Sequence, residues 1–295
     1  SFICYSTFKI TYLVIKYLYK RRILLIYTKF ITYFQIIVEV PFMNDSITII
    51  DENKVIDVVL IAGRILLESG AETYRVEDTM NRIAHSYGLN DTYSFVTSTA
   101  IIFSLNDRTN TRLIRIRERT TDLEKIALTN SLSRKIAKNE LNIDEAKSEL
   151  IHLSKASLQY SFLLNFIAAA IACGFFLFMF GGVASDCWIA VIAGGAAFLT
   201  FSLVQRFIQI KFFSEFVASA VVITIAVTFT KLGIATNQNI ITISSVMPLV
   251  PGILICNAIR DLMAGELLAG MSRGVEAALT SFAIGAGVAI VLLIL

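Results

Sequence analysis

The side chains most able to do chemistry lie in an apolar stretch near the C-terminal end of the chain. Two prolines and a glycine interrupt this stretch, and polar residues follow them: Pro248, Pro251 and Gly252, then Asn257, Arg260, Asp261 and Glu266. A broken backbone or an unpaired charge at membrane depth is costly, and it persists only where protein or a water-filled cavity surrounds it. Interrupted helices with such side chains are typical of the substrate sites of membrane transporters.

The spacing of these polar residues predicts a shared helical face, because Asn257 and Asp261 are one turn apart and Arg260 lies beside them. Arg260 would bind a substrate carboxylate, and Asp261 or Glu266 would bind an amino group or relay a proton. In the alternative interpretation, the charges of an interfacial hairpin only extend to the lipid headgroups. The two prolines remove two backbone donors within one turn and favour the broken helix. Asn165 is predicted to be a second buried polar residue of the pathway.

The composition predicts a protein with a soluble part and a membrane part. Of its 295 residues 56% are hydrophobic and 17% are charged, which is too apolar for an ordinary soluble domain. Most charges precede residue 158, so we expect a soluble α+β domain over residues 43–157 and an all-α membrane domain over 158–295. The net charge of +3 is too small to indicate nucleic-acid binding. The four cysteines form no C-x-x-C pair, so no metal site or cofactor is predicted.

Residues 1–42 differ from the rest of the chain. They are a repetitive mixture of Ile, Tyr, Phe, Lys and Thr without clear helical or strand periodicity, which AT-rich DNA tends to encode in any reading frame. We therefore expect a mistranslated upstream extension, with Met43 as the true start. The alternative is a membrane segment around Ile23–Val40, which Lys29 and Glu39 weaken.

The soluble domain is predicted to have the element order ααββαα. Val55–Glu68 and Glu72–Tyr87 show helical periodicity, and Gly70 falls where a helix would end. Thr92–Leu105 and Thr111–Arg119 have strand-like patterns on either side of a turn cluster, which predicts a hairpin with one basic face. Two helices follow, each opened by a capping box: Thr121 with Glu124, and Asn142 with Glu145.

The densest charged cluster of this domain is Glu72, Arg75, Glu77 and Asp78. On a helix Arg75 lies three residues from both Glu72 and Asp78, which is close enough for ion pairs. In one interpretation the acids favour the first helical turn and complement its dipole. In the other, a buried ionic cluster fixes how this helix docks on the membrane domain, or gates substrate.

The histidines and glycines give no support to catalysis. His85 and His152 fall in separate predicted helices, and neither belongs to a metalloprotease or nucleophile-elbow motif. The soluble domain has no phosphate-binding glycine loop, so we expect that the chain is not an enzyme.

Five apolar segments are long enough, or nearly so, to cross a hydrocarbon core of ~30 Å with about 20 helical residues each. They are Leu158–Phe180, Trp188–Val204, Phe212–Thr230, Ile240–Ala258 and Val275–Leu295. Alternate loops are basic, which predicts a cytoplasmic soluble domain, a multi-pass fold in the cell membrane and a C-terminus outside. The odd number of spans suggests an oligomer, in which a partner or a second copy completes the bundle.

Two separate strings resemble a known family. Ser69–Met80 reads SGAETYRVEDTM, and Val250–Leu267 reads VPGILICNAIRDLMAGEL. Both resemble the N-terminal component of the threonine/serine exporter family, over a region from about Val55 to the C-terminus. The resemblance implies a cytoplasmic domain followed by roughly five spans, with a second, smaller membrane component that is either fused or encoded separately. Because this chain stops after the first component, the resemblance implies a separate partner subunit.

The sequence and the resemblance together predict a subunit of a secondary exporter for a small polar metabolite, threonine or serine first. Relatives that are split into two chains include a succinate exporter, so a dicarboxylate is the alternative substrate. No ATP-binding motif is present, and an ion gradient or the substrate gradient would drive the flux. A different alternative is a membrane-anchored sensor or scaffold whose soluble domain carries the function.

Overall fold

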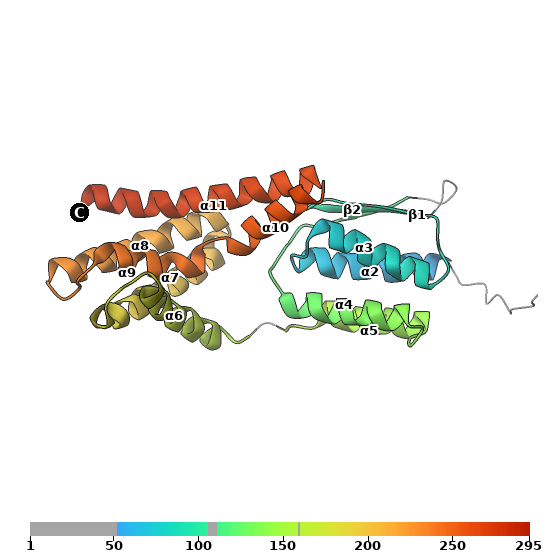
Figure 1. Cartoon of the computed structure of the whole chain (residues 1–295), viewed down its shortest axis with the longest axis horizontal. Helices are drawn as coiled ribbons and strands as arrows, with labels where there is room; N and C mark the ends of the chain where they lie inside the picture. Colours follow the sequence, from blue (N-terminus) through green and yellow to red (C-terminus); the bar gives the residue numbers. More distant parts are fainter. Residues whose placement is uncertain (1–51, 106–110, 159) are drawn as a thin grey trace, which may run out of the picture. The chain divides into compact units, whose positions relative to one another are not determined.

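Helices dominate the part of the chain that the computed structural model describes, residues 52–105, 111–158 and 160–295 (Figure 1). The predicted upstream extension 1–42 and the predicted start at Met43 lie outside the described residues, as does the predicted turn cluster at 106–110. Within the described ranges the chain first builds helices around a small sheet and then continues as a series of apolar helices.

The first two helices are α2 (Glu52–Glu68) and α3 (Thr73–Ser86), close to the predicted bounds. Ten of the 17 residues of α2 are buried, as expected for a helix that is apolar on most of its circumference. Gly70 adopts a φ of 87° in the link between the helices, a left-handed conformation that favours glycine. This link, residues 70–73, becomes important for the functional site.

The sheet has three antiparallel strands, in the order β1 (Thr92–Val96), β2 (Ala100–Leu105) and β3 (Arg112–Arg115). The sequence predicted one strand over Thr92–Leu105, and this was wrong because residues 97–99 form a turn. The Thr97 hydroxyl accepts a hydrogen bond from the Ala100 N–H, and the Thr97 N–H donates to the Ala100 carbonyl. The observed order is therefore ααβββαα.

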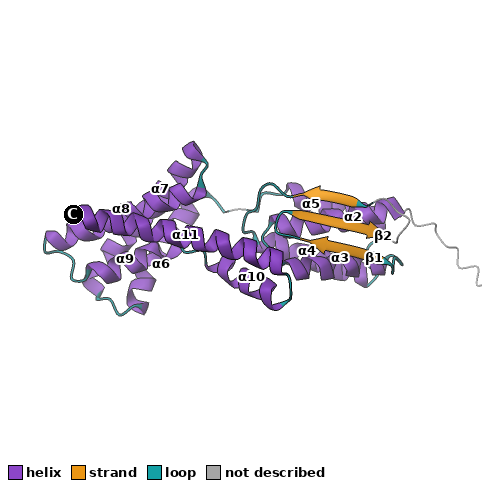
Figure 2. Ribbon diagram, turned by 90° about the horizontal axis from the view of Figure 1, so that it is seen from above, coloured by secondary structure: helices purple, strands orange, loops and turns teal. Residues whose placement is uncertain are grey.

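Two further helices, α4 (Leu123–Ala137) and α5 (Ile143–Lys155), complete this part of the fold. The capping box of Asn142 and Glu145 is confirmed. The predicted box at Thr121 is wrong by one residue, since Asp122 caps α4 by accepting from the Lys125 N–H at 2.9 Å. The sheet packs on α2 and α3, and α4 and α5 cover the opposite side of these helices, which gives an α+β arrangement around one apolar core (Figures 1 and 2).

The remaining helices include four that are long and apolar enough to cross a membrane, or five spans if a bent pair counts as one. The four are α6 (Phe162–Met179), α7 (Cys187–Ile208, preceded by the short helix η1, Ala184–Asp186), α8 (Lys211–Lys231) and α11 (Leu267–Ile294). The bent pair joins α9 (Gln238–Val246) and η2 (Met247–Leu249) to α10 (Gly252–Met263) at an angle of 62°. The last predicted span began too late, because α11 already starts at Leu267 and therefore includes Arg273.

Close packing around α8 holds the apolar helices together. α8 contacts α7, α9 and α11. Gly287 of α11 lies so near α8 that an added Cβ would stand 2.4 Å from the Phe216 carbonyl oxygen. Gly194 of α7 is similarly close to Cys173 of α6, with 2.2 Å between such a Cβ and the sulfur. These glycines let helices approach closely, as small residues do in membrane bundles.

Candidate functional site

The helix predicted to be interrupted near Pro248 is interrupted in the structure. Pro248 lies in η2, and Pro251 directly precedes α10. The Val250 N–H donates a hydrogen bond to the Met247 carbonyl at 3.1 Å. The N–H groups of Ile253 and Leu254, in the first turn of α10, have no hydrogen-bond acceptor among the described residues. The break therefore presents the electropositive start of a helix inside a group of apolar helices.

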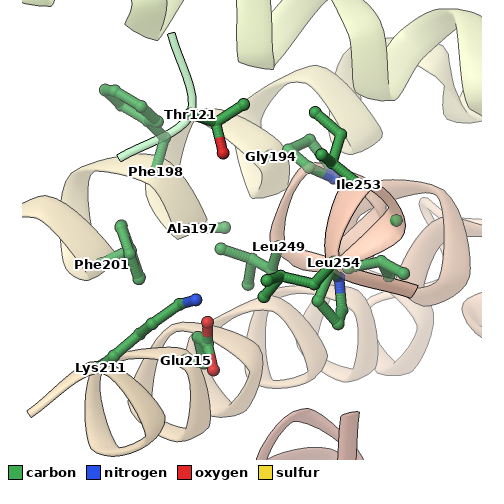
Figure 3. A pocket seen from close by; sticks show the side chains of 14 residues that line it. Thr121, Gly194, Ala197, Phe198, Phe201, Lys211, Glu215, Leu249, Ile253 and Leu254 are labelled. Carbon is green, nitrogen blue, oxygen red and sulfur yellow. The ribbon is translucent and has the colours of Figure 1, made fainter. Parts of the chain in front are cut away.

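A cavity of about 300 Å³ opens at this break, and we call it the helix-break cavity (Figure 3). Its wall is formed by the break itself, by α7, by the start of α8 and by Thr121 from the loop before α4. The α7 side chains are small or aromatic: Gly194, Ala197, Phe198 and Phe201. Most of the lining is thus apolar, as in other small-molecule sites, and only a few polar groups face the space.

Two ionisable side chains of α8, Lys211 and Glu215, line the helix-break cavity, and Figure 3 shows the Lys211 nitrogen and a Glu215 oxygen facing each other. The Lys211 Nζ lies 3.3 Å from Glu276 Oε1, and the other oxygen of Glu276 lies 2.9 Å from the Arg119 guanidinium. Sequence reasoning missed Glu215 and treated Lys211 only as a loop charge. The available signal was their i, i+4 spacing at the start of an apolar span.

The predicted pathway residues lie elsewhere, where α10 and α11 meet residues Gly70–Thr73, and we call these contacts the Gly70–Thr73 junction. Asp261 Oδ1 accepts hydrogen bonds from the Thr73 N–H and from the Thr73 hydroxyl, both at 3.1 Å. Glu72, at the N-cap position of α3, makes no capping hydrogen bond of its own. Asp261 therefore caps α3 from another helix and places a negative charge at its positive end.

Arg273 of α11 completes the buried part of the Gly70–Thr73 junction. One guanidinium nitrogen lies 3.0 Å from Asp261 Oδ2, and the other donates to the Ala71 carbonyl at 2.6 Å. The two side chains are only 2% and 0% exposed. Asn257 adds a hydrogen bond from its Nδ2 to the Gly70 carbonyl at 2.9 Å. A buried ion pair with these extra hydrogen bonds is costly to break from one side only.

Glu72 forms the outer edge of the junction. Its Oε1 accepts from the Arg260 guanidinium at 2.6 Å, and its Oε2 lies 3.5 Å from Arg75. Burial acts to raise the pKa of Glu72. Hydrogen bonds from its own backbone N–H and from Arg260, with the charge of Arg75, hold the pKa below its ordinary value. Glu72 is therefore a carboxylate that joins α3 to α10.

The other members of that cluster serve separate contacts. The spacing had predicted a pair between Asp78 and Arg75, but Asp78 pairs with Arg82 instead. Glu77 accepts from the Val96 N–H at 2.7 Å and so holds β1 against α3. Burial, and after it the charge of Glu266, raises the pKa of Glu77 above its ordinary value, while the hydrogen bond opposes this shift. Glu266 itself is half-buried at the start of α11.

Asn165 does not occupy the buried position that was expected. It is exposed in the first turn of α6, and its Nδ2 donates to the Tyr160 carbonyl at 3.3 Å. It lines a different cavity, together with the loop residues before α4. Across the described ranges no three His, Cys, Asp or Glu side chains are grouped so that they could hold a metal ion.

Comparison with known proteins places the chain in a family. Residues 57–295 match the family described as "Putative threonine/serine exporter". A "Probable threonine/serine exporter" of Mycobacterium tuberculosis is 25% identical over 227 residues, which are 75% of this chain and 42% of that protein. The chain thus spans less than half of the length of this curated relative, and no solved structure matches it significantly. Because the family match covers most of the sequence, including the junction and the cavity, the chain belongs to the threonine/serine exporter family of multi-pass membrane transporters.

Proposed function

We propose that the chain exports threonine or serine across the cell membrane. Family membership supports an exporter, and the helix-break cavity is the observation that carries the proposal to a site. A polar solute needs polar groups on its route through apolar helices, and an interrupted helix supplies backbone groups for it. The volume of about 300 Å³ lies at the lower end of the range for small-molecule sites, which suits a small amino acid.

The Gly70–Thr73 junction is proposed to couple the first helices to the transport site. α10 carries both the lining of the cavity, near Gly252, and the junction residues Asp261 and Arg260. A movement of α10 that opens the cavity therefore also changes the contacts to α3. In this proposal the buried pair of Asp261 and Arg273, which joins α10 to α11, separates when α10 moves and forms again when α10 returns.

A second membrane component is proposed to complete the transporter. More than half of the curated relative lies outside the region that matches this chain. Large apolar side chains on the described helices, such as Phe175, Phe207 and Phe282, are exposed and offer surface to lipid or to partner helices. We place the Lys211 end of the bundle in the cytoplasm and the Asp186 end outside, because basic residues gather at the first.

The test is export from intact cells of the source organism with and without the gene. Cells are fed a threonine-containing dipeptide, and intracellular and extracellular amino acids are measured over time. The deletion strain is expected to retain threonine or serine, and re-expression is expected to restore export. Retention of succinate instead would identify the dicarboxylate alternative, whereas unchanged levels of all three would favour the sensor or scaffold.

A further inference from the structure

The helix-break cavity contains an acidic and a basic side chain that the Gly70–Thr73 junction does not use. Glu215 and Lys211 are one turn apart on α8 and line the cavity across from Ile253 and Leu254 at the start of α10 (Figure 3). We propose that this cavity binds its substrate as a zwitterion, with the ammonium group at Glu215 and the carboxylate at Lys211 and the first turn of α10. The proposal rests on the proposed export function and names the chemical class of its substrate.

Glu215 is a buried carboxylate whose neighbours are the Thr280 hydroxyl and the positive charge of Lys211, and its hydrogen bonding is incomplete. The residue is only 3% exposed, and its Oε2 accepts no well-aligned hydrogen bond from the described residues, although the Thr280 hydroxyl lies beside the carboxylate. The Lys211 Nζ donates to Glu276 at 3.3 Å, and it forms no hydrogen bond with Glu215 in the structure. An unpartnered polar atom in such surroundings is strongly disfavoured. An ammonium group in the cavity would satisfy it with a charge-assisted hydrogen bond.

The opposite side of the cavity suits a carboxylate. The N–H groups of Ile253 and Leu254 have no acceptor among the described residues, and they lie at the positive end of α10. Helix starts of this kind bind anions through the backbone. Lys211 adds a full positive charge, and its bond to Glu276 uses one of three donors of the ammonium group.

The same arrangement separates a zwitterion from a dicarboxylate. A dicarboxylate of similar size would place its second negative group in the space next to Glu215, where like charges repel. A substrate with only an amino group would leave Lys211 and the start of α10 without an anion. The cavity therefore favours a molecule with one positive and one negative group close together, as in an α-amino acid.

Binding of threonine and three matched probes tests this assignment. The full chain is purified in lipid nanodiscs, and unlabelled competitors displace radiolabelled threonine. The probes are 3-hydroxybutyrate, which is threonine without its amino group, 1-amino-2-propanol, which is threonine without its carboxylate, and succinate. Each of the first two probes loses a hydrogen bond to a charged group, and succinate replaces the ammonium group with a second carboxylate. Threonine is therefore expected to bind about tenfold or more tightly than any of the three.

The variants then assign each charge to its partner. Glu215→Gln is expected to lose the preference for threonine over 3-hydroxybutyrate but to keep the preference over 1-amino-2-propanol. Lys211→Met is expected to do the reverse. Glu149→Gln and Lys138→Met, which replace exposed residues outside the cavity, serve as matched controls and are expected to keep both preferences. These ratios are measured on folded protein, so a loss of yield does not obscure them.

The possible results separate this proposal from the proposed function. Threonine binding by the wild type, with both preferences unchanged in Glu215→Gln and Lys211→Met, would overturn the site assignment and leave the export function standing. Tighter binding of succinate than of threonine would overturn the zwitterion. A wild type that binds no amino acid would overturn this proposal and the export function together.

Discussion

Asp261 is the residue whose replacement tests the Gly70–Thr73 junction most sharply. Its carboxylate is fully buried, accepts two hydrogen bonds from Thr73 and lies 3.0 Å from the Arg273 guanidinium. Asp261→Asn keeps the size and one acceptor oxygen but leaves Arg273 buried without its counter-ion. Breaking a buried pair from one side costs about 3–5 kcal/mol. At roughly 2–4 °C per kcal/mol, the midpoint of thermal unfolding is expected to fall by about 6–20 °C.

The assay is thermal unfolding of the purified full chain, together with its abundance in the membrane. Arg260→Gln is the matched control, because its side chain is 60% exposed and solvent screens its pair with Glu72, so only a small change is expected. The double variant Asp261→Asn, Arg273→Met removes both buried charges and is expected to recover most of the loss. An unfolding midpoint of Asp261→Asn equal to that of the wild type would refute the role of the buried pair.

Other substitutions test the response to pH, the helix packing and the topology. The pKa of Glu72 is lowered, so Glu72→Gln is expected to reduce the unfolding temperature near neutral pH, with the deficit shrinking as the pH falls below the ordinary value of 4.5. The pKa of Glu77 is raised by burial and a neighbouring carboxylate, so the charged form of Glu77 destabilises the fold at neutral pH. Relative to the wild type, Glu77→Gln is therefore expected to have a higher unfolding temperature at neutral pH than it has in acid. Equal effects of either variant at both pH values would contradict these shifts. Gly287→Leu would drive a side chain into the α8 backbone and is expected to lower the unfolding temperature. An unfolding temperature of this variant equal to that of the wild type would argue against the close packing. With the native cysteines replaced, Ser185→Cys is expected to react with an impermeant maleimide added outside and Gln209→Cys is not, and the reverse pattern would overturn the topology.

Local signals in the sequence predicted most of the elements. The capping box of Asn142 and Glu145 and the burial of α2 depend on residues a few positions apart, and both are observed. The turn at residues 97–99 was missed because its β-branched residues have the composition of a strand. The hydroxyl of Thr97, which closes that turn, is a hydrogen-bonding feature that periodicity does not register.

The site was predicted only in part, because its contacts join distant segments. Thr73 and Asp261 are 188 residues apart, and helical spacing around Asp261 could not reveal that it caps α3. The sequence did single out the interrupted helix, since prolines act locally on the backbone. Glu215 was overlooked because a lone acid near the end of an apolar segment resembles a headgroup-level charge, and its burial follows only from the packing of α8.

Threonine efflux from membrane vesicles measures whether the chain moves a small amino acid through the helix-break cavity. Vesicles are prepared from the wild type, from the deletion strain and from strains that express Glu215→Gln or the exposed control Lys138→Met, and all are preloaded with radiolabelled threonine. We expect rapid release from the wild type and the control, and slow release from Glu215→Gln, as from the deletion strain. Release from wild-type vesicles at the rate of the deletion strain would contradict the export function, and wild-type release from Glu215→Gln would contradict the pathway.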